Sequence, residues 1–256
     1  MEFIDTHSHL YDEAFSSEED QALERAIQAG VTRLILPDID SQTRDAMFSL
    51  ADRHPEAVFA CAGLHPTSID DRWEEELRAA EEAAGSHRIY AIGEIGLDCY
   101  WSTDFLEQQK EAFRRQLILA DRMDLPVIIH SRESTELIIS ILKEQKHLSL
   151  KGVFHAFSGS IETYRELQKL GDWYIGIGGV LTYRKASIAE TVKNIPLERM
   201  LLETDSPYLT PAPFRGKRNE SSYIPYIAEK LALQKEISIE EVAETTTANA
   251  QKLFRL

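Results

Sequence analysis

The stretch Phe3-Ile-Asp-Thr-His-Ser-His9 decides the fold and the chemistry that we expect of this chain. It is an apolar run that ends in two histidines, His7 and His9, two residues apart. In an extended strand, residues i and i+2 point to the same side, so both imidazoles can be aimed at one point. Imidazole is the commonest metal ligand among side chains. The stretch therefore predicts a β-strand that carries two candidate metal ligands at its carboxyl end.

Seven further apolar runs follow the first one along the chain. The eight runs are Phe3–Thr6, Val31–Leu36, Val58–Leu64, Ile89–Ile95, Leu125–Ile129, Gly152–Phe157, Trp173–Ile177 and Met200–Glu203. Their residues are apolar at consecutive positions, as expected for parallel strands that are covered on both faces. The runs therefore predict eight buried parallel strands.

Between and after the runs lie segments whose apolar residues recur with the period of an α-helix. They are Glu18–Ala29, Phe105–Met123, Thr135–Lys146, Tyr223–Leu233 and Ser238–Phe254. Gly30 and Gly171 are predicted to cap helices at their carboxyl ends. Ser238, with Glu241 three residues later, resembles a capping box. Strands that alternate with helices indicate a parallel α/β sheet.

Eight strand–helix units in 256 residues predict an α/β fold of the (β/α)8 TIM-type barrel class, since such barrels typically need about 250 residues. We expect residues 1–256 to form one such barrel domain, with no linker. A doubly wound open sheet is the alternative. The polar residues favour the barrel, because barrel active sites collect groups from the carboxyl ends of many strands, whereas an open sheet gathers them at one switch point.

Composition limits the possible partners. Lys plus Arg total 28 and Asp plus Glu total 43, which gives a net charge of −15. This acidity argues against a broad, sequence-independent nucleic-acid binder but not against an enzyme with a local contact. Cys61 and Cys99 have no paired spacing, and the chain shows neither a signal segment nor an apolar run long enough to span a membrane. We therefore expect a cytoplasmic protein with no membrane contact and no obligate protein partner.

Six candidate metal ligands fall near the predicted strand ends. They are His7, His9, Glu94, His130, His155 and Asp205. Taken singly, a strand histidine is usually structural, and Asp205 before Ser-Pro fits a turn. Glu94 is harder to dismiss, because a carboxylate inside an apolar strand must be paired or bound to metal. Six nitrogen and oxygen ligands exceed the needs of one tetrahedral site and suit two cations. Glu94 is the natural bridge between them.

These residues carry a resemblance that covers essentially the whole chain. The motifs are Asp5-Thr-His-Ser-His9, Gly63-Leu-His-Pro66, Gly93-Glu-Ile-Gly-Leu-Asp98, Pro126-Val-Ile-Ile-His-Ser-Arg132, His155-Ala-Phe-Ser-Gly159, Glu203-Thr-Asp-Ser-Pro-Tyr208 and Pro213-Phe-Arg-Gly-Lys-Arg-Asn219. In this order they resemble the TatD family of metal-dependent deoxyribonucleases, within the amidohydrolase-like barrels. The family commonly has an aromatic residue after Leu-Asp, where this chain has Cys99.

The resemblance implies a (β/α)8 fold, two divalent cations and phosphodiester hydrolysis. By motif, His7, His9 and Glu94 would hold one cation with Asp205 close to it, and Glu94, His130 and His155 would hold the other. Nitrogen-rich ligand sets suit Zn, Ni, Fe or Mn, whereas Mg prefers oxygen, and the sequence does not name the native metal. The expected substrate is DNA, as single strands or 3′ ends.

Supporting roles are predicted for residues near the ligands. Asp205 and Glu94 are candidate catalytic residues, with Asp205 as general base. His65 is predicted to bind a phosphate or to orient water, with a structural His-Pro turn as the alternative. Arg132 and Arg215 are predicted to contact substrate phosphates, since guanidinium matches phosphate oxygens in pairs. For Arg132 the alternative is an ion pair with a neighbouring glutamate.

Other interpretations remain open. Tyr100 and Trp101 are predicted either to stack on a base or to pack over the following helix. The same site on an amidohydrolase-like barrel would suit a small ester, amide or phosphoester, or deacylation of D-aminoacyl-tRNA. A metal-bound scaffold without activity is a third function class, which turnover of labelled DNA would exclude.

Overall fold

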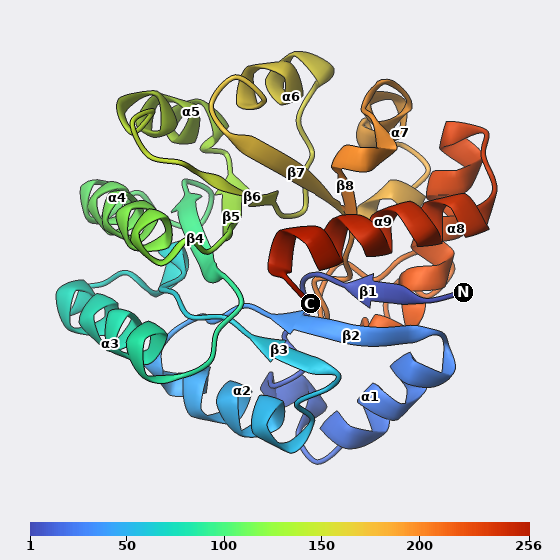
Figure 1. Ribbon diagram of the computed structural model, residues 1–256, viewed down its shortest axis with the longest axis horizontal. Coiled ribbons are helices and arrows are strands. Elements are labelled where there is room, and N and C mark those ends of the chain that lie inside the picture. Colours follow the sequence, from blue (N-terminus) through green and yellow to red (C-terminus); the bar gives the residue numbers. More distant parts are fainter.

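The computed structural model describes residues 1 to 256, and its centre is a ring of eight parallel strands (Figure 1). All pairings between neighbouring strands are parallel. The strands are β1 (Phe3–Asp5), β2 (Val31–Leu36), β3 (Val58–Ala60), β4 (Ile92–Asp98), β5 (Val127–Arg132), β6 (Lys151–Phe154), β7 (Asp172–Ile177) and β8 (Met200–Leu202). Each of the eight predicted runs thus contains or overlaps a strand.

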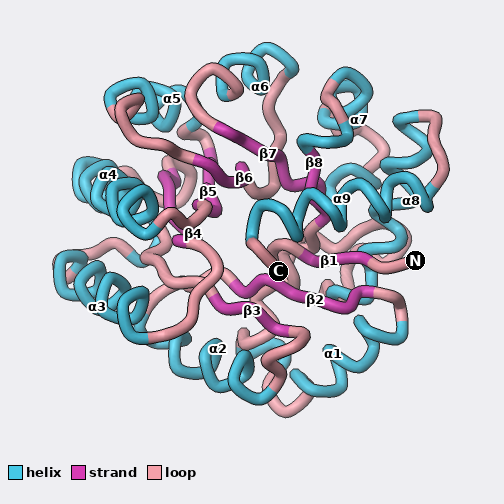
Figure 2. The backbone as a smooth tube through the Cα atoms, viewed as in Figure 1, coloured by secondary structure: helices cyan, strands magenta, loops and turns pink.

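Nine α-helices lie around the strands, and Figure 2 shows the strands in magenta inside a ring of cyan helices. They are α1 (Glu19–Gln28), α2 (Ser41–Arg53), α3 (Trp73–Ser86), α4 (Leu106–Met123), α5 (Thr135–Glu144), α6 (Ile161–Leu167), α7 (Ile188–Thr191), α8 (Ile224–Lys235) and α9 (Ile239–Phe254). None of these helices combines the length and the apolar character that a membrane span requires.

Two seams close the strands into a barrel. The ladder divides into β1–β3 and β4–β8. A single bridge between Ala62 and Ile92 joins β3 to β4. At the other seam, the Thr6 amide donates to Leu202 O at 3.0 Å, so the first strand contacts the last. The predicted (β/α)8 barrel is confirmed, and the open doubly wound sheet is excluded.

The barrel interior is built in layers. The layer nearer the amino ends of the strands is apolar. It contains Ile4, Ile35, Phe59, Ile128, Val153, Tyr174 and Leu201, and Leu253 and Phe254 of α9 cover it. Figure 1 shows α9 lying across this end of the barrel. Side chains two residues apart share a face of a strand. Because Ile128 and Val153 point inward, His130 and His155 point into the next layer, at the carboxyl ends of the strands.

Some local predictions hold and others do not. Gly30 follows α1 with a φ of 88°, as expected of a helix cap. Ser238 caps α9, because its hydroxyl accepts a hydrogen bond from the Glu241 amide at 3.1 Å. Gly171 was wrongly predicted as a cap, since α6 already ends at Leu167 and Gly171 lacks a positive φ. A Cβ on Gly171 would lie 2.7 Å from Leu150 O, so close packing explains this glycine.

We expect Gly96→Ala to destabilise the barrel by about 2–3 kcal/mol, because of backbone strain and overpacking. Gly96 in β4 has a φ of 143°, and a Cβ there would lie 2.0 Å from His130 O. Gly85→Ala in α3 is the matched control, since its Cβ would meet nothing within 4 Å. The control should gain up to about 1 kcal/mol. Urea unfolding measures both, and a Gly96→Ala variant as stable as the parent would contradict the close contact.

Candidate metal centre

The Glu94 carboxylate lies at the centre of the polar layer and is only 2% exposed. Its two oxygens face different sets of imidazoles. Oε2 lies 3.0 Å from His7 Nε2 and 3.8 Å from His9 Nε2. Oε1 lies 2.8 Å from His130 Nδ1 and 3.6 Å from His155 Nε2. One carboxylate thus joins two groups of nitrogen donors.

The first group forms where β1 and β8 end. His7 Nε2 and His9 Nε2 are 3.2 Å apart. Asp205 Oδ1 lies 3.6 Å from the first of these nitrogens and 3.5 Å from the second. Three donor atoms therefore converge with Glu94 Oε2 in a space that suits one cation.

Buried Asp5 holds this first group in place. Its carboxylate accepts hydrogen bonds from the amide of His7 at 3.2 Å and the amide of Thr204 at 2.9 Å. It also accepts the Thr204 hydroxyl at 2.6 Å. The Asp205 amide in turn donates to His7 O at 2.8 Å. Asp5 thus fixes the end of the first strand against the end of the last, where His7 and Asp205 meet.

The second group forms where β5 and β6 end, and each histidine is held by a carboxylate on its outer nitrogen. His130 Nε2 lies 2.9 Å from Asp98 Oδ2. His155 Nδ1 lies 3.1 Å from Glu203 Oε1, and Glu203 also accepts the Ala156 amide. A carboxylate on the second nitrogen of a metal-binding histidine fixes its ring and tautomer. These contacts leave His130 Nδ1 and His155 Nε2 directed at Glu94.

His65 belongs to this second group as well. Its Nε2 lies 3.5 Å from Glu94 Oε1 and 3.3 Å from His130 Nδ1. Its Nδ1 accepts the Thr67 amide at 3.1 Å, which caps the short turn Pro66–Ser68. His65 thus forms the structural His-Pro turn while its Nε2 faces Glu94, and its role toward phosphate or water stays a prediction.

Electrostatics show how strongly the groups are coupled. Burial alone would raise the pKa of Glu94, but His7, His155 and His65 outweigh it and hold that pKa well below its usual range. Burial lowers the pKa of His130, yet Asp98 and Glu94 raise it to about 9. A cation that binds these imidazoles must displace their protons.

The donor set fits divalent cations. Two combinations place three donor atoms within 4.8 Å of one another around Glu94: His7 and His9 with Glu94, and His65 and His130 with Glu94. A further combination joins His7, His155 and Glu203. Of the eight histidines in the chain, five lie here: His7, His9, His65, His130 and His155. The structure brings all six predicted ligands to this one place.

The two predicted phosphate-binding arginines lie outside this cluster. Arg132 Cζ lies 3.9 Å from the centre of the Tyr100 ring, and the structure shows no ion pair to Glu133 or Glu136. Arg215 Cζ lies 4.4 Å from the centre of the Tyr183 ring. Neither guanidinium forms a salt bridge within the protein. Both are free to meet a substrate, and their phosphate contacts stay a prediction.

Asp5, Asp98 and Glu203 were missed as positioning residues by the sequence analysis. Each is a carboxylate in or shortly after an apolar run, and each is almost completely buried. The cost of burying a charge, which singled out Glu94, applies to all three. That signal marks them as paired residues, although it does not say which histidine each one holds.

Known proteins resemble the chain over its whole length. The family model described as TatD related DNase matches residues 4–255. An uncharacterized metal-dependent hydrolase of Bacillus subtilis, YabD, is 41% identical, and the match covers 99% of both chains. A protein of Erwinia tasmaniensis named 3′-5′ ssDNA/RNA exonuclease TatD is 34% identical over 99% of this chain and 100% of its own.

A solved structure agrees with these sequence matches. YjjV, a TatD homologue from Escherichia coli K12, is 33% identical and superposes with a TM-score of 0.89. The match covers 99% of this chain and 98% of that chain. The sequence motifs, the barrel and the donor cluster lead to one assignment: the chain belongs to the TatD-related DNase family of metal-dependent hydrolases.

Proposed function

We propose that this hydrolase cleaves phosphodiester bonds in single-stranded nucleic acid, as a TatD-type deoxyribonuclease that removes nucleotides from the end of a strand. The observation that carries the proposal is the division of the Glu94 carboxylate between two groups of histidines. Such a division suits a pair of cations, the arrangement found in many phosphodiesterases. The exonuclease name of the Erwinia relative supports the choice of substrate.

The residues that would hold the cations are taken from the family motifs, and the distances above are compatible with them. His7, His9 and Glu94 would hold one, with Asp205 beside it, and Glu94, His130 and His155 would hold the other. Imidazole-rich ligands favour Zn, Ni or Mn, although Mg is common in enzymes that act on phosphates. When bound, the cations supply Lewis-acid activation of water and of the phosphoryl oxygens.

Asp205 would take the proton of the attacking water. Burial raises the pKa of Asp205, but His155, His9 and His7 outweigh it and lower that pKa overall. The carboxylate is therefore ionised at neutral pH, and its Oδ1 points at the first histidine group. A group that accepts a proton from water must be ionised and within reach, and Asp205 meets both conditions. His65, beside Glu94 Oε1, would orient the phosphate or the water.

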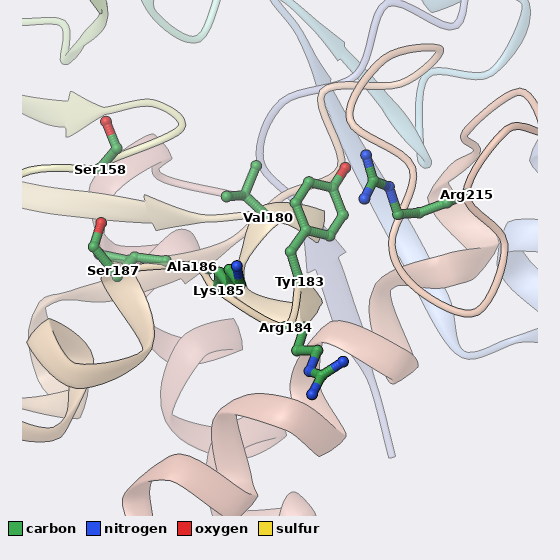
Figure 3. Close-up of a pocket in the computed structure, with 9 residues that line it drawn as sticks. Ser158, Val180, Tyr183, Arg184, Lys185, Ala186, Ser187 and Arg215 are labelled. Atoms are coloured by element: carbon green, nitrogen blue, oxygen red, sulfur yellow. The ribbon is translucent and has the colours of Figure 1, made fainter.

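A basic pocket at the carboxyl ends of the strands supports a polyanionic substrate. It has a volume of about 540 Å³ and is lined by loops that follow β6, β7 and β8, the same ends of strands that hold His155 and Asp205. Its lining includes Arg184, Lys185 and Arg215 but no carboxylate. Figure 3 shows Arg215 reaching toward the Tyr183 ring, with two serines on the far side of the pocket. In a chain of net charge −15, this is a local site for phosphates.

Glu94→Gln should lower the content of both cations, because one carboxylate serves both groups. Elemental analysis of Mn²⁺- or Zn²⁺-reconstituted parent should find about two ions per chain, as in two-metal hydrolases. Glu136→Gln, an exposed position on α5, is the matched control and should bind like the parent. A Glu94→Gln protein that still bound two ions as tightly as the parent would rule out the shared carboxylate.

Asp205→Asn should separate catalysis from metal binding. The amide keeps the shape and one oxygen but cannot accept a proton at neutral pH, so turnover should fall by roughly 10²-fold or more while metal stays largely bound. His155→Ala should lose a cation instead, because it removes a nitrogen directed at Glu94. The readouts are metal content and cleavage of labelled single-stranded DNA. Near-parental turnover of Asp205→Asn, or metal loss equal to that of His155→Ala, would contradict the assignment.

A double change, Lys185→Ala with Arg215→Ala, should weaken binding of a DNA oligomer and flatten its salt dependence by about 0.7 per lost phosphate contact. Cleavage of bis(4-nitrophenyl) phosphate should change little, since that substrate has no neighbouring nucleotides to contact Lys185 and Arg215. Arg218 is left intact because it binds Ala14 O and Glu18. Lys252→Ala on α9, at the closed end of the barrel, is the control. Equal losses on both substrates would assign these residues to stability or chemistry instead.

A further inference from the structure

We propose that Tyr100, Trp101 and Arg132 bind an unpaired nucleobase beside the metal centre, and we call these three residues the aromatic clasp. The inference rests on the proposed function and adds the part of the substrate that this side of the site recognises. The two rings meet edge to face, with centroids 5.0 Å apart. Arg132 Cζ lies 3.9 Å from the Tyr100 ring centre and 5.2 Å from that of Trp101.

The clasp faces solvent. Tyr100 is 51% exposed and Trp101 is 69% exposed. The predicted alternative, packing of both rings over the following helix, is therefore wrong for most of their surface. Large aromatic side chains usually lie buried, and exposed groups of them mark binding sites. The rings and the flat guanidinium offer π-faces and a positive charge, which together suit a base attached to a phosphate.

Asp98 ties the clasp to the metal centre. Its Oδ1 accepts hydrogen bonds from the amides of Tyr100 at 2.9 Å and Trp101 at 3.0 Å. Its Oδ2 lies 2.9 Å from Nε2 of His130, whose other nitrogen faces Glu94. One buried side chain thus sets both the ring of a proposed metal ligand and the loop that carries the clasp.

Strand β5 makes the same connection a second time. His130 and Arg132 are two residues apart on it, and Asp98 is paired with Arg132 in the β4–β5 ladder. Gln109 of α4 fixes the start of the loop, because its side-chain oxygen accepts a hydrogen bond from the Asp98 amide at 2.9 Å. The clasp therefore has a fixed place relative to the catalytic centre, as a specificity subsite requires.

Another exposed aromatic residue at the rim differs from the clasp. Tyr208 lies near His9, with ring centroids 6.3 Å apart, but its hydroxyl is bound to Asp12 at 3.2 Å. The clasp rings have no such side-chain hydrogen bond, and about half or more of each side chain is exposed, so ring surface beside the Arg132 guanidinium is open to stacking. Stacking needs an unpaired base, because a duplex covers the faces of its bases. The clasp thus selects single strands or frayed ends.

The test compares the binding of two phosphorothioate oligonucleotides, each about ten nucleotides long, that resist hydrolysis and carry the same charge. One is oligodeoxyadenylate and the other is abasic at every position. Both are titrated against Mn²⁺-reconstituted protein and followed by anisotropy of a 5′ dye. Trp101→Ala and Tyr100→Ala should each weaken binding of the adenylate oligomer by about 5- to 100-fold, the range of one stacked base. Binding of the abasic oligomer should stay nearly unchanged.

Tryptophan fluorescence gives a second, independent reading. The adenylate oligomer should quench the parent, and Trp101→Phe should abolish most of the quenching while it keeps most of the affinity. Trp73→Phe is the matched fluorescence control. Tyr226→Ala, a 40% exposed ring on α8, is the matched control for binding. Equal weakening on both oligomers, or quenching that survives in Trp101→Phe, would overturn the clasp.

Asp98→Asn tests the positioning role. One oxygen of Asp98 accepts the amides of Tyr100 and Trp101, and the other faces Nε2 of His130. An asparagine has only one side-chain oxygen, so either the loop or the histidine must lose its acceptor. Metal content, affinity for the adenylate oligomer or both should fall, and a variant in which neither falls would overturn the role of Asp98. Base-dependent binding by a parent that does not cleave DNA would refute the proposed nuclease and retain the clasp. Cleavage of DNA by a parent whose binding does not depend on the bases would support the proposed nuclease and refute the clasp.

Discussion

The burial of the Glu94 carboxylate is the constraint on which the site depends. A carboxylate removed from water costs several kcal/mol unless opposite charges or hydrogen bonds compensate it. Here five imidazoles surround it, and further carboxylates balance their charge: Asp98 and Glu203 on the outer nitrogens of His130 and His155, and Asp205 beside His7 and His9. The resulting network is satisfied only when every member is in place. The donors therefore depend on one another for their positions.

The barrel makes this arrangement possible by dividing its interior into two layers. Apolar residues fill the layer next to α9, and the polar groups sit one step further along the same strands. Parallel strands point all their carboxyl ends at one face, so ligands that are distant in sequence converge there. Asp5 adds the last requirement, because it fastens the closing seam at the point where His7 and Asp205 must meet.

Much of this could be predicted from the sequence. The eight apolar runs correspond to eight strands, and the histidines at their ends form the donor cluster. This was predictable because the face to which a strand residue points depends only on its position along that strand. Helices α2, α3, α6 and α7 were not predicted. The partners of Asp98 and Glu203 were not predicted either. Those partners depend on register between neighbouring strands, which is not local. Arg132 shows the difference: an ion pair with an adjacent glutamate was the alternative prediction, but the structure places its guanidinium over the Tyr100 ring. The cytoplasmic location stays a prediction.

The most direct test of the account is anomalous diffraction from crystals soaked in Mn²⁺. The account predicts two anomalous peaks in each chain. One should lie beside Glu94 Oε2 among His7, His9 and Asp205, and the other beside Oε1 among His130 and His155. The shared position of Glu94 would then be visible directly. A single peak, or two peaks of which one does not touch Glu94, would contradict the central claim that this carboxylate joins two metal sites.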